Sequence, residues 1–216
     1  MIIVEIRGDR IRLTSITLED VYKMRNWGVH ENPLLYDYNL PPLTDEEIKE
    51  WYYFKTIGNS KRYYSVYNEE NKFIGYMGIK HIRRIWKEAT LGIVFDPNYI
   101  NQGYGTEGII TYLNYYFNEM KMKTLYLEVA KFNKRAIRCY EKSGFKVIDV
   151  YLDEFFDQTI DFNNPYFLQE KSSFVIKNGK IYNYIYKMKI DRKTYLKERE
   201  QIDKLNIRDK IRPTIK

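Results

Sequence analysis

Two glycines in the segment 98–108 (NYINQGYGTEG) form the first pattern in the sequence that could bind a ligand. Gly103 and Gly105 follow an apolar run that ends near Phe95, and they let the backbone turn sharply and present consecutive N–H groups. A helix that begins here adds the positive end of its dipole, so the turn could hold phosphate oxygens. Ordinary turn chemistry is the commoner reason for two such glycines, and neither a Walker A nor a dinucleotide motif is completed.

A second pattern lies in the segment 133–145 (NKRAIRCYEKSGF). Asn133 suits the N-cap of a helix, and Gly144 suits a left-handed C-cap. Asn133 and Tyr140 are then about two helical turns apart, roughly 10.5 Å along one face. This spacing predicts an amide and a phenol that point into one groove. The alternative is that Tyr140, one of 22 tyrosines, lies at the edge of the core.

The elements that must position these residues follow from periodicity, capping and turn signals. Capping boxes at Thr17 and Thr44 predict helices over 17–27 and 45–57, and Asn178-Gly179 is a strong hairpin signal. Further helices are expected over 106–120 and 133–142, and strands over 10–15, 62–67, 72–82, 89–95, 124–129, 145–151, 173–177 and 180–190. This order predicts a mixed α/β sheet with helices on both faces.

Composition limits the remaining possibilities. The chain has 216 residues, a net charge of +7, a single cysteine (Cys139) and two histidines, which favours one domain without a disulfide or a metal site. No apolar stretch is long enough to span a membrane, and charges at positions 5, 7 and 9 interrupt any signal peptide, so we expect a cytoplasmic protein. The charge excess allows an anionic partner, although a solvated surface explains it equally well.

The two patterns together resemble a known family. Residues 127–145 are similar to the Asn-x-x-Ala-x-x-x-Tyr-x-x-x-Gly-Phe motif of the GNAT acyl-CoA N-acyltransferases, and residues 91–108 are similar to their acetyl-CoA pyrophosphate loop. The sequences of residues 103–107 and 133–137 resemble those of the ribosomal-protein N-terminal acetyltransferases and spermidine acetyltransferases, which form one branch of this family. The resemblance implies a GNAT-type mixed, mostly antiparallel twisted sheet with helices on both faces and a C-terminal β-hairpin.

We therefore expect a GNAT domain over residues 1–191 with an insertion at about 153–172. Residues 192–216 are highly charged and are expected to form a C-terminal helix or tail.

The resemblance also implies roles for individual residues in an acetyl-CoA-dependent N-acetyltransferase that needs no metal. Tyr140 would protonate the departing CoA thiolate, since a phenol with a pKa near 10 can donate to a thiolate whose conjugate acid has a pKa of about 8–9. Asn133 would bind the pantetheine arm, and the loop amides would bind the pyrophosphate. Lys134, Arg135 and Arg138 are candidates for the 3′-phosphate, and charges that are simply solvated on the helix are the alternative. The full expected cofactor set is Phe95, Gln102, Gly103, Tyr104, Gly105, Thr106, Asn133 and Arg135.

Two positions depart from the family pattern. Ile100 stands where relatives often carry Arg or Gln, and Thr90 stands where they often carry a catalytic glutamate. The general base is therefore open: Glu128 is our first candidate, with a strand-end salt bridge as its alternative role, and the others are His30, Glu31 and His81.

The acceptor is expected at the insertion. Asp153, Glu154, Asp157 and Asp161 form an acidic stretch in a basic protein, which favours a cationic acceptor such as a polyamine or a basic peptide N-terminus. His30 and Glu31 fall in a loop that borders the acceptor site in relatives. An amino sugar or antibiotic as acceptor, and a non-catalytic acyl-CoA sensor, are the alternatives. Nucleic-acid binding is a further alternative, but only the net charge supports it, and we expect neither a nucleic-acid nor a membrane partner. The sequence leaves open whether the protein forms a homodimer.

Overall fold

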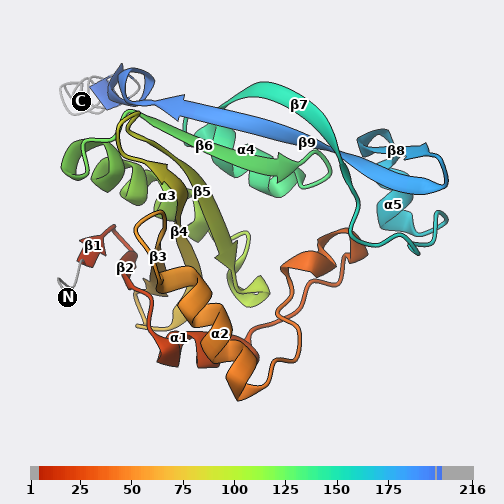
Figure 1. Cartoon of the computed structure of the whole chain (residues 1–216), viewed down its shortest axis with the longest axis horizontal. Coiled ribbons are helices and arrows are strands. Elements are labelled where there is room, and N and C mark those ends of the chain that lie inside the picture. Colours follow the sequence, from red (N-terminus) through yellow and green to blue (C-terminus); the bar gives the residue numbers. More distant parts are fainter. Residues whose placement is uncertain (1–4, 198, 201–216) are drawn as a thin grey trace, which may run out of the picture.

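The fold is built on one nine-stranded sheet, which the computed structural model describes over residues 5–197 and 199–200 (Figure 1). The strand order is β1-β2-β3-β4-β5-β6-β9-β7, and β8 pairs with β9 beside this path. The strands are β1 (Glu5–Arg7), β2 (Ile11–Ser15), β3 (Arg62–Asn68), β4 (Phe73–Arg83), β5 (Glu88–Phe95), β6 (Thr124–Ala130), β7 (Lys146–Glu154), β8 (Phe174–Lys177) and β9 (Lys180–Asp191). The pairing of β5 with β6 is parallel, and the other pairings among the described residues are antiparallel. The expected mixed, mostly antiparallel sheet is confirmed.

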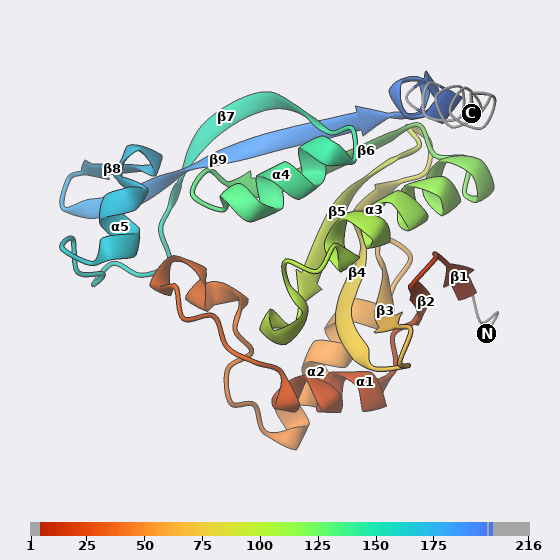
Figure 2. The ribbon, with the colours of Figure 1, turned by 180° about the vertical axis from the view of Figure 1, so that it is seen from behind.

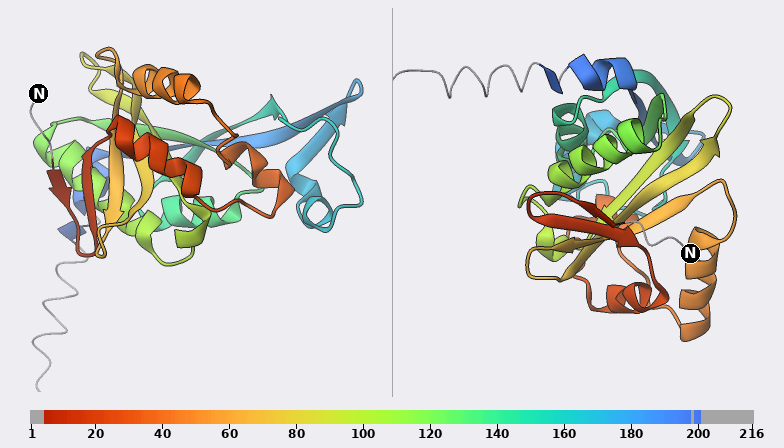
Figure 3. Two further views of the ribbon diagram at one scale, coloured as in Figure 1. Left: turned by 90° about the horizontal axis from the view of Figure 1, so that it is seen from below. Right: turned by 90° about the vertical axis from the view of Figure 1, so that its left-hand side faces the viewer.

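The helices cover both faces of this sheet (Figures 2 and 3). They are α1 (Leu18–Lys23), α2 (Asp45–Thr56), α3 (Tyr104–Asn114), α4 (Lys134–Lys142) and α5 (Pro165–Gln169), with a shorter 3₁₀ segment η2 (Pro33–Tyr38). Side chains alternate along β4, so Met77 and Ile79 join the core under α3, while Tyr76 packs on the opposite side with α1 and α2. The two faces therefore have separate cores.

The sequence signals explain why these helices form where they do. Thr17 and Thr44 each make a capping box, with Asp20 and Glu47 respectively, as predicted. The α3 stripe of Ile109, Leu113 and Tyr112 is fully buried, and each side chain of this size contributes about 1.5–3 kcal/mol when it leaves water. The helix begins at Tyr104, two residues before the predicted start, because Gly103 adopts a left-handed conformation as its N-cap.

The feature that shapes the site is a gap between β5 and β6. Their pairing covers only Glu88–Thr90 against Thr124–Tyr126. Beyond Thr90 the strands separate, while β4 still pairs with β5 as far as Phe95 and β9 still pairs with β6 as far as Ala130. One edge of β5 is thus left with unpaired backbone groups that a ligand can use.

The segment after β7 is a folded unit. Phe155, Phe167 and Phe174 are buried with Leu34 of η2 and Phe132 in a third hydrophobic cluster. This cluster ties the segment to η2, which follows α1 in the sequence. Residues 153 and 154, where the insertion was predicted to begin, still belong to β7, and the insertion itself stays a prediction.

The two ends of the described chain add smaller elements. The short strand β1 was not predicted, and the hairpin of β8 and β9 turns at Asn178 and Gly179 with positive φ angles, as predicted. Residues 192–197 are helical, and the rest of the charged segment 192–216 lies outside the described residues, apart from 199–200.

Candidate functional site

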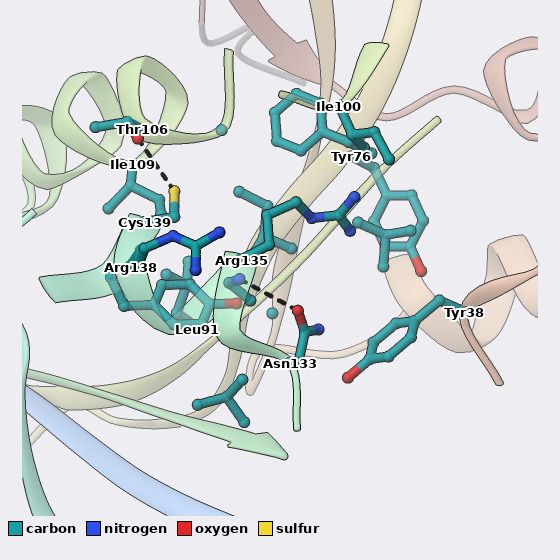
Figure 4. A pocket seen from close by; sticks show the side chains of 18 of the residues that line it. Tyr38, Tyr76, Leu91, Ile100, Thr106, Ile109, Asn133, Arg135, Arg138 and Cys139 are labelled. Carbon is teal, nitrogen blue, oxygen red and sulfur yellow. Dashed lines mark hydrogen bonds between the residues drawn. The ribbon is translucent and has the colours of Figure 1, made fainter. Parts of the chain in front are cut away.

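A cavity of about 610 Å³ occupies the gap between β5 and β6 (Figure 4). This main cavity is lined by β5 from Thr90 to Phe95, by β6, by the N-terminal region of α3, by α4 along its length, and by residues of α2, β3 and β4. From the expected cofactor and catalytic sets it contains Phe95, Gly103, Gly105, Thr106, Glu128, Asn133, Arg135 and Tyr140. The gap thus brings these eight residues together, although Phe95 and Tyr140 lie 45 positions apart in the sequence.

The loop before α3 is held rigidly by Arg10. The Arg10 guanidinium pairs with Glu107 at 3.0 Å, donates to the Gln102 carbonyl at 3.2 Å and lies over the Tyr104 ring. Gly103 has a φ of 88°, so a side chain there would be strained. The side chains of Gln102 and Tyr104, which the sequence placed in the cofactor site, do not line the main cavity. Tyr104 donates to Glu69 at 3.0 Å instead, and both residues brace the loop.

Asn133 and Tyr140 reach the cavity from α4, as their spacing predicted. The Asn133 Oδ1 accepts from the Ala136 backbone N–H at 3.2 Å, so the side-chain NH₂ group is available to a ligand (Figure 4). Tyr140 is buried, and this burial raises the pKa of its phenol above the usual value near 10. The phenol therefore keeps its proton at neutral pH and is available as a hydrogen-bond donor in the cavity.

Cys139 lies between α3 and α4 and faces the same cavity. Its Sγ is 3.3 Å from the Thr106 Oγ1, and burial raises the pKa of the thiol. A thiol that stays protonated is a poor nucleophile, so Cys139 is assigned a packing role between the two helices.

Positive charge surrounds most of the main cavity. Lys55, Lys80, Arg135, Arg138 and Lys142 line it, and Glu128 is the one carboxylate among its described lining residues. Arg135 projects into the middle of the cavity, where burial lowers the pKa of its guanidinium (Figure 4). Lys134, the neighbouring candidate for the 3′-phosphate, does not line the main cavity and pairs with Glu170 at 3.4 Å.

A smaller cavity of about 210 Å³ adjoins the main one and has the opposite charge. We call it the acidic pocket, because Asp37, Glu128, Asp153 and Glu154 line it and no Lys or Arg of the described chain does. Tyr38, Glu128 and Val129 line both cavities, so the two spaces meet there. Burial, followed by the charge of Glu128, raises the pKa of the neighbouring Tyr151 to about 12.

Only some of the expected acceptor residues reach these cavities. His30 lines the main cavity, where burial and then the charge of Arg135 lower its pKa and keep it neutral. Glu31 and His81 lie outside both cavities. Asp157 and Asp161 also lie outside, because each carboxylate accepts hydrogen bonds from its own turn, from Thr159 and Asn163 respectively.

Sequence reasoning missed several residues of the site, and those that matter most for its charge are Asp37 and Tyr38 of η2, Lys55 of α2 and Lys80 of β4. The sequence could have shown in part that Lys80 belongs to the site, because side chains alternate along a strand and Tyr76 and Lys80 must share one face of β4. Which face meets the gap follows only from the register of β4 on β5, where Tyr76 pairs with Val94 and Lys80 with Thr90.

Comparison with known proteins agrees with this geometry. Residues 10–146 match the model of the acetyltransferase (GNAT) domain. The chain belongs to the GNAT acetyltransferases. The spermidine N(1)-acetyltransferase of Vibrio cholerae is 26% identical over 166 residues, covering 76% of this chain and 96% of that protein. The Escherichia coli spermidine N(1)-acetyltransferase is 25% identical over 146 residues, covering 68% of this chain and 78% of that protein.

A solved structure shares the fold of this GNAT acetyltransferase. The spermidine N-acetyltransferase from Vibrio cholerae in complex with CoA and spermine superimposes with a TM-score of 0.67 at 23% identity. The match covers 88% of this chain and 99% of that one. The protein is thus an N-acetyltransferase of the acetyl-CoA-using family. Within its described residues, no helix is both long and apolar enough to cross a membrane.

Proposed function

We propose that this GNAT acetyltransferase moves the acetyl group of acetyl-CoA to a terminal primary amine of a polyamine. The observation that carries the proposal is the acidic pocket, which opens into the main cavity at Glu128 and Tyr38. Glu154 pairs with Lys180 at 2.8 Å, so Asp37, Glu128 and Asp153 supply the negative charge that attracts a chain of ammonium groups and orients it. The names of the two bacterial relatives point to the same acceptor class.

Acetyl-CoA would enter from the side of α3 and α4. The backbone N–H groups around Gly103, at the start of α3, suit the pyrophosphate, and the Asn133 amide suits the pantetheine arm. The unpaired edge of β5 between Leu91 and Phe95 offers N–H groups to the thioester carbonyl, where negative charge develops. Arg138 and Lys142 add positive charge on the cofactor side of the main cavity.

The amine must lose a proton before it attacks the thioester. With a pKa near 10, only about one amine in a thousand is neutral at pH 7. Glu128 lies where the two cavities meet and is the proposed proton acceptor, directly or through water. Tyr140 then gives its phenolic proton to the CoA thiolate as it leaves.

A protein N-terminus is the second acceptor considered from the sequence. The acidic pocket would also suit a basic peptide, but its volume of about 210 Å³ fits a narrow aliphatic chain better than a folded protein's terminal residues. The polyamine is therefore the acceptor we propose.

The charge of the acidic pocket gives a direct test. In the double variant Asp37→Asn/Asp153→Asn, we expect the KM for spermidine to rise about tenfold, since two partly exposed carboxylates together contribute on the order of 1–2 kcal/mol to binding a polycation. The KM for acetyl-CoA should not change. Thiol release during steady-state turnover measures both constants.

The matched control is Asp157→Asn/Asp161→Asn, which removes the same amount of charge outside the pocket. A monoamine of similar length should react less efficiently than spermidine, and the difference should shrink as salt shortens the Debye length from about 10 Å at 0.1 M to about 3 Å at 1 M. Equal use of the two amines, or a spermidine KM that both double variants alter alike, would refute the polyamine proposal.

A further inference from the structure

One end of the main cavity carries two lysines that the transfer of acetyl to a polyamine does not explain. Lys55 comes from α2 and Lys80 from β4, and both line the cavity on the sheet face opposite α3. Lys80 pairs across the strands with Thr90, and Gly78 pairs with Gly92. The lysines therefore lie beside the stretch of β5 over which the acceptor must approach, and neither of them lines the acidic pocket.

No carboxylate compensates the charge of Lys55 within the described part of the chain. The charged groups that act on Lys55 are two further cations, Lys80 and Lys61. The Lys55 Nζ instead lies 4.8 Å from the ring centre of Tyr63, 5.0 Å from that of Trp51 and 5.8 Å from that of Tyr76. Such ring faces stabilise a cation only in part, about 0.5–2 kcal/mol each.

This environment destabilises the charged form of Lys55. Burial, and then the charges of Lys80 and Lys61, lower the pKa of its ammonium group. A half-buried cation that faces a second cation across open space gains most from an anion placed between them. The rings around Lys55 leave its open side toward the cavity.

From this placement we infer that Lys55 and Lys80 form a subsite for a carboxylate. Two ammonium groups supply point-charge donors, and the phenol groups of Tyr63 and Tyr76 line the same end of the cavity. A small monoanion fits between the lysines and the ring faces and neutralises the charge that repels a cationic acceptor. The main cavity and the acidic pocket then form one bipolar groove, anionic at Asp37 and Asp153 and cationic at Lys55 and Lys80.

The carboxylate has two conceivable sources, which share this chemistry. It is either a group of the acceptor itself, placed on the far side of the reacting amine, or a free carboxylate that binds beside a polyamine. The inference rests on the proposed function in one respect, which is the place in the cavity where the amine reacts. The subsite itself rests on the geometry of the two lysines.

The test compares the wild type with Lys55→Gln/Lys80→Gln, and Lys61→Gln serves as the control. Lys61 is a neighbouring lysine that acts on Lys55 but does not line either cavity. In the first arm, cadaverine is compared with lysine, which is the same diamine with one carboxylate added. If the acceptor supplies the carboxylate, lysine should be used with at least a tenfold higher kcat/KM, and this preference should disappear in the double variant only.

The second arm needs no activity. Propionate is titrated against each protein in a carboxylate-free buffer, and the melting temperature is followed, because a ligand that binds the folded state raises it with concentration. If a free carboxylate occupies the subsite, the wild type and Lys61→Gln should show a saturable rise, and the double variant should not. The single variant Lys80→Gln, at an exposed position, should weaken the effect if the double variant is too unstable to measure.

The inference is overturned if the double variant matches the wild type in both arms. An enzyme that does not acetylate spermidine, yet loses propionate binding in Lys55→Gln/Lys80→Gln, would contradict the polyamine proposal and support the subsite. The two proposals can therefore fail separately.

Discussion

Tyr140→Phe is expected to lower kcat by about 10²-fold and to leave the KM for acetyl-CoA nearly unchanged. The substitution keeps the ring that packs on Phe145 and deletes the hydroxyl, which burial keeps protonated. A proton supplied only as the thiolate leaves stabilises the transition state and not the bound substrate, so the loss of about 2.7 kcal/mol falls on kcat. Steady-state kinetics with varied acetyl-CoA separates the two constants.

Tyr112→Phe is the matched control for this experiment. Tyr112 is fully buried on α3, its hydroxyl has no hydrogen-bond partner among the described residues, and it does not line either cavity. Its removal should leave kcat intact and should not lower the melting temperature, since an unsatisfied buried hydroxyl only costs stability. If Tyr140→Phe behaves like this control, water protonates the thiolate and Tyr140 serves packing alone.

Gly92→Leu should abolish acetyl transfer, with a loss of at least about 10²-fold in kcat/KM, while the protein still folds. Apart from its chain neighbours, a Cβ at Gly92 would have no atom within 4 Å, so the new side chain would begin in the open space of the main cavity. It would occupy the space between the lysine end and the acidic pocket, where the amine must meet the thioester. A misplacement of about 1 Å at such a point already costs about 10²-fold.

The contrast with Gly78 makes this prediction specific. Gly78 pairs with Gly92 across the strands, but a Cβ there would lie 2.2 Å from the Arg62 carbonyl oxygen, so Gly78→Ala should destabilise the fold itself. Circular dichroism and melting temperatures should show a native Gly92→Leu and a damaged Gly78→Ala. A Gly92→Leu protein that keeps full activity would mean that the acceptor does not pass over this strand.

Local features of the fold were predictable because each depends on neighbouring residues. The capping boxes at Thr17 and Thr44, the Asn178-Gly179 turn and the Asn133 cap need only a few adjacent positions to form. The same holds for the left-handed Gly103 that starts α3. The family pattern added the order of the strands, which no short segment determines by itself.

The charge pattern of the site was beyond local reasoning. Asp157 and Asp161 are acidic in sequence, but their carboxylates are used by their own turns. Asp37 and Lys55 carry no motif, and they enter the site because η2 and α2 pack where β5 and β6 separate. Long-range packing of this kind depends on sheet register and on the hydrophobic clusters, and these join residues from distant parts of the chain.

The most direct test of the account is the structure of the protein bound to a conjugate in which spermidine is joined to the sulfur of CoA. The account predicts the pyrophosphate on the amides around Gly103, the sulfur within hydrogen-bond distance of the Tyr140 hydroxyl, and the distal ammonium groups among Asp37, Glu128 and Asp153. A conjugate with its CoA portion in place and its polyamine arm directed toward Lys55 and Lys80, away from the acidic pocket, would contradict it.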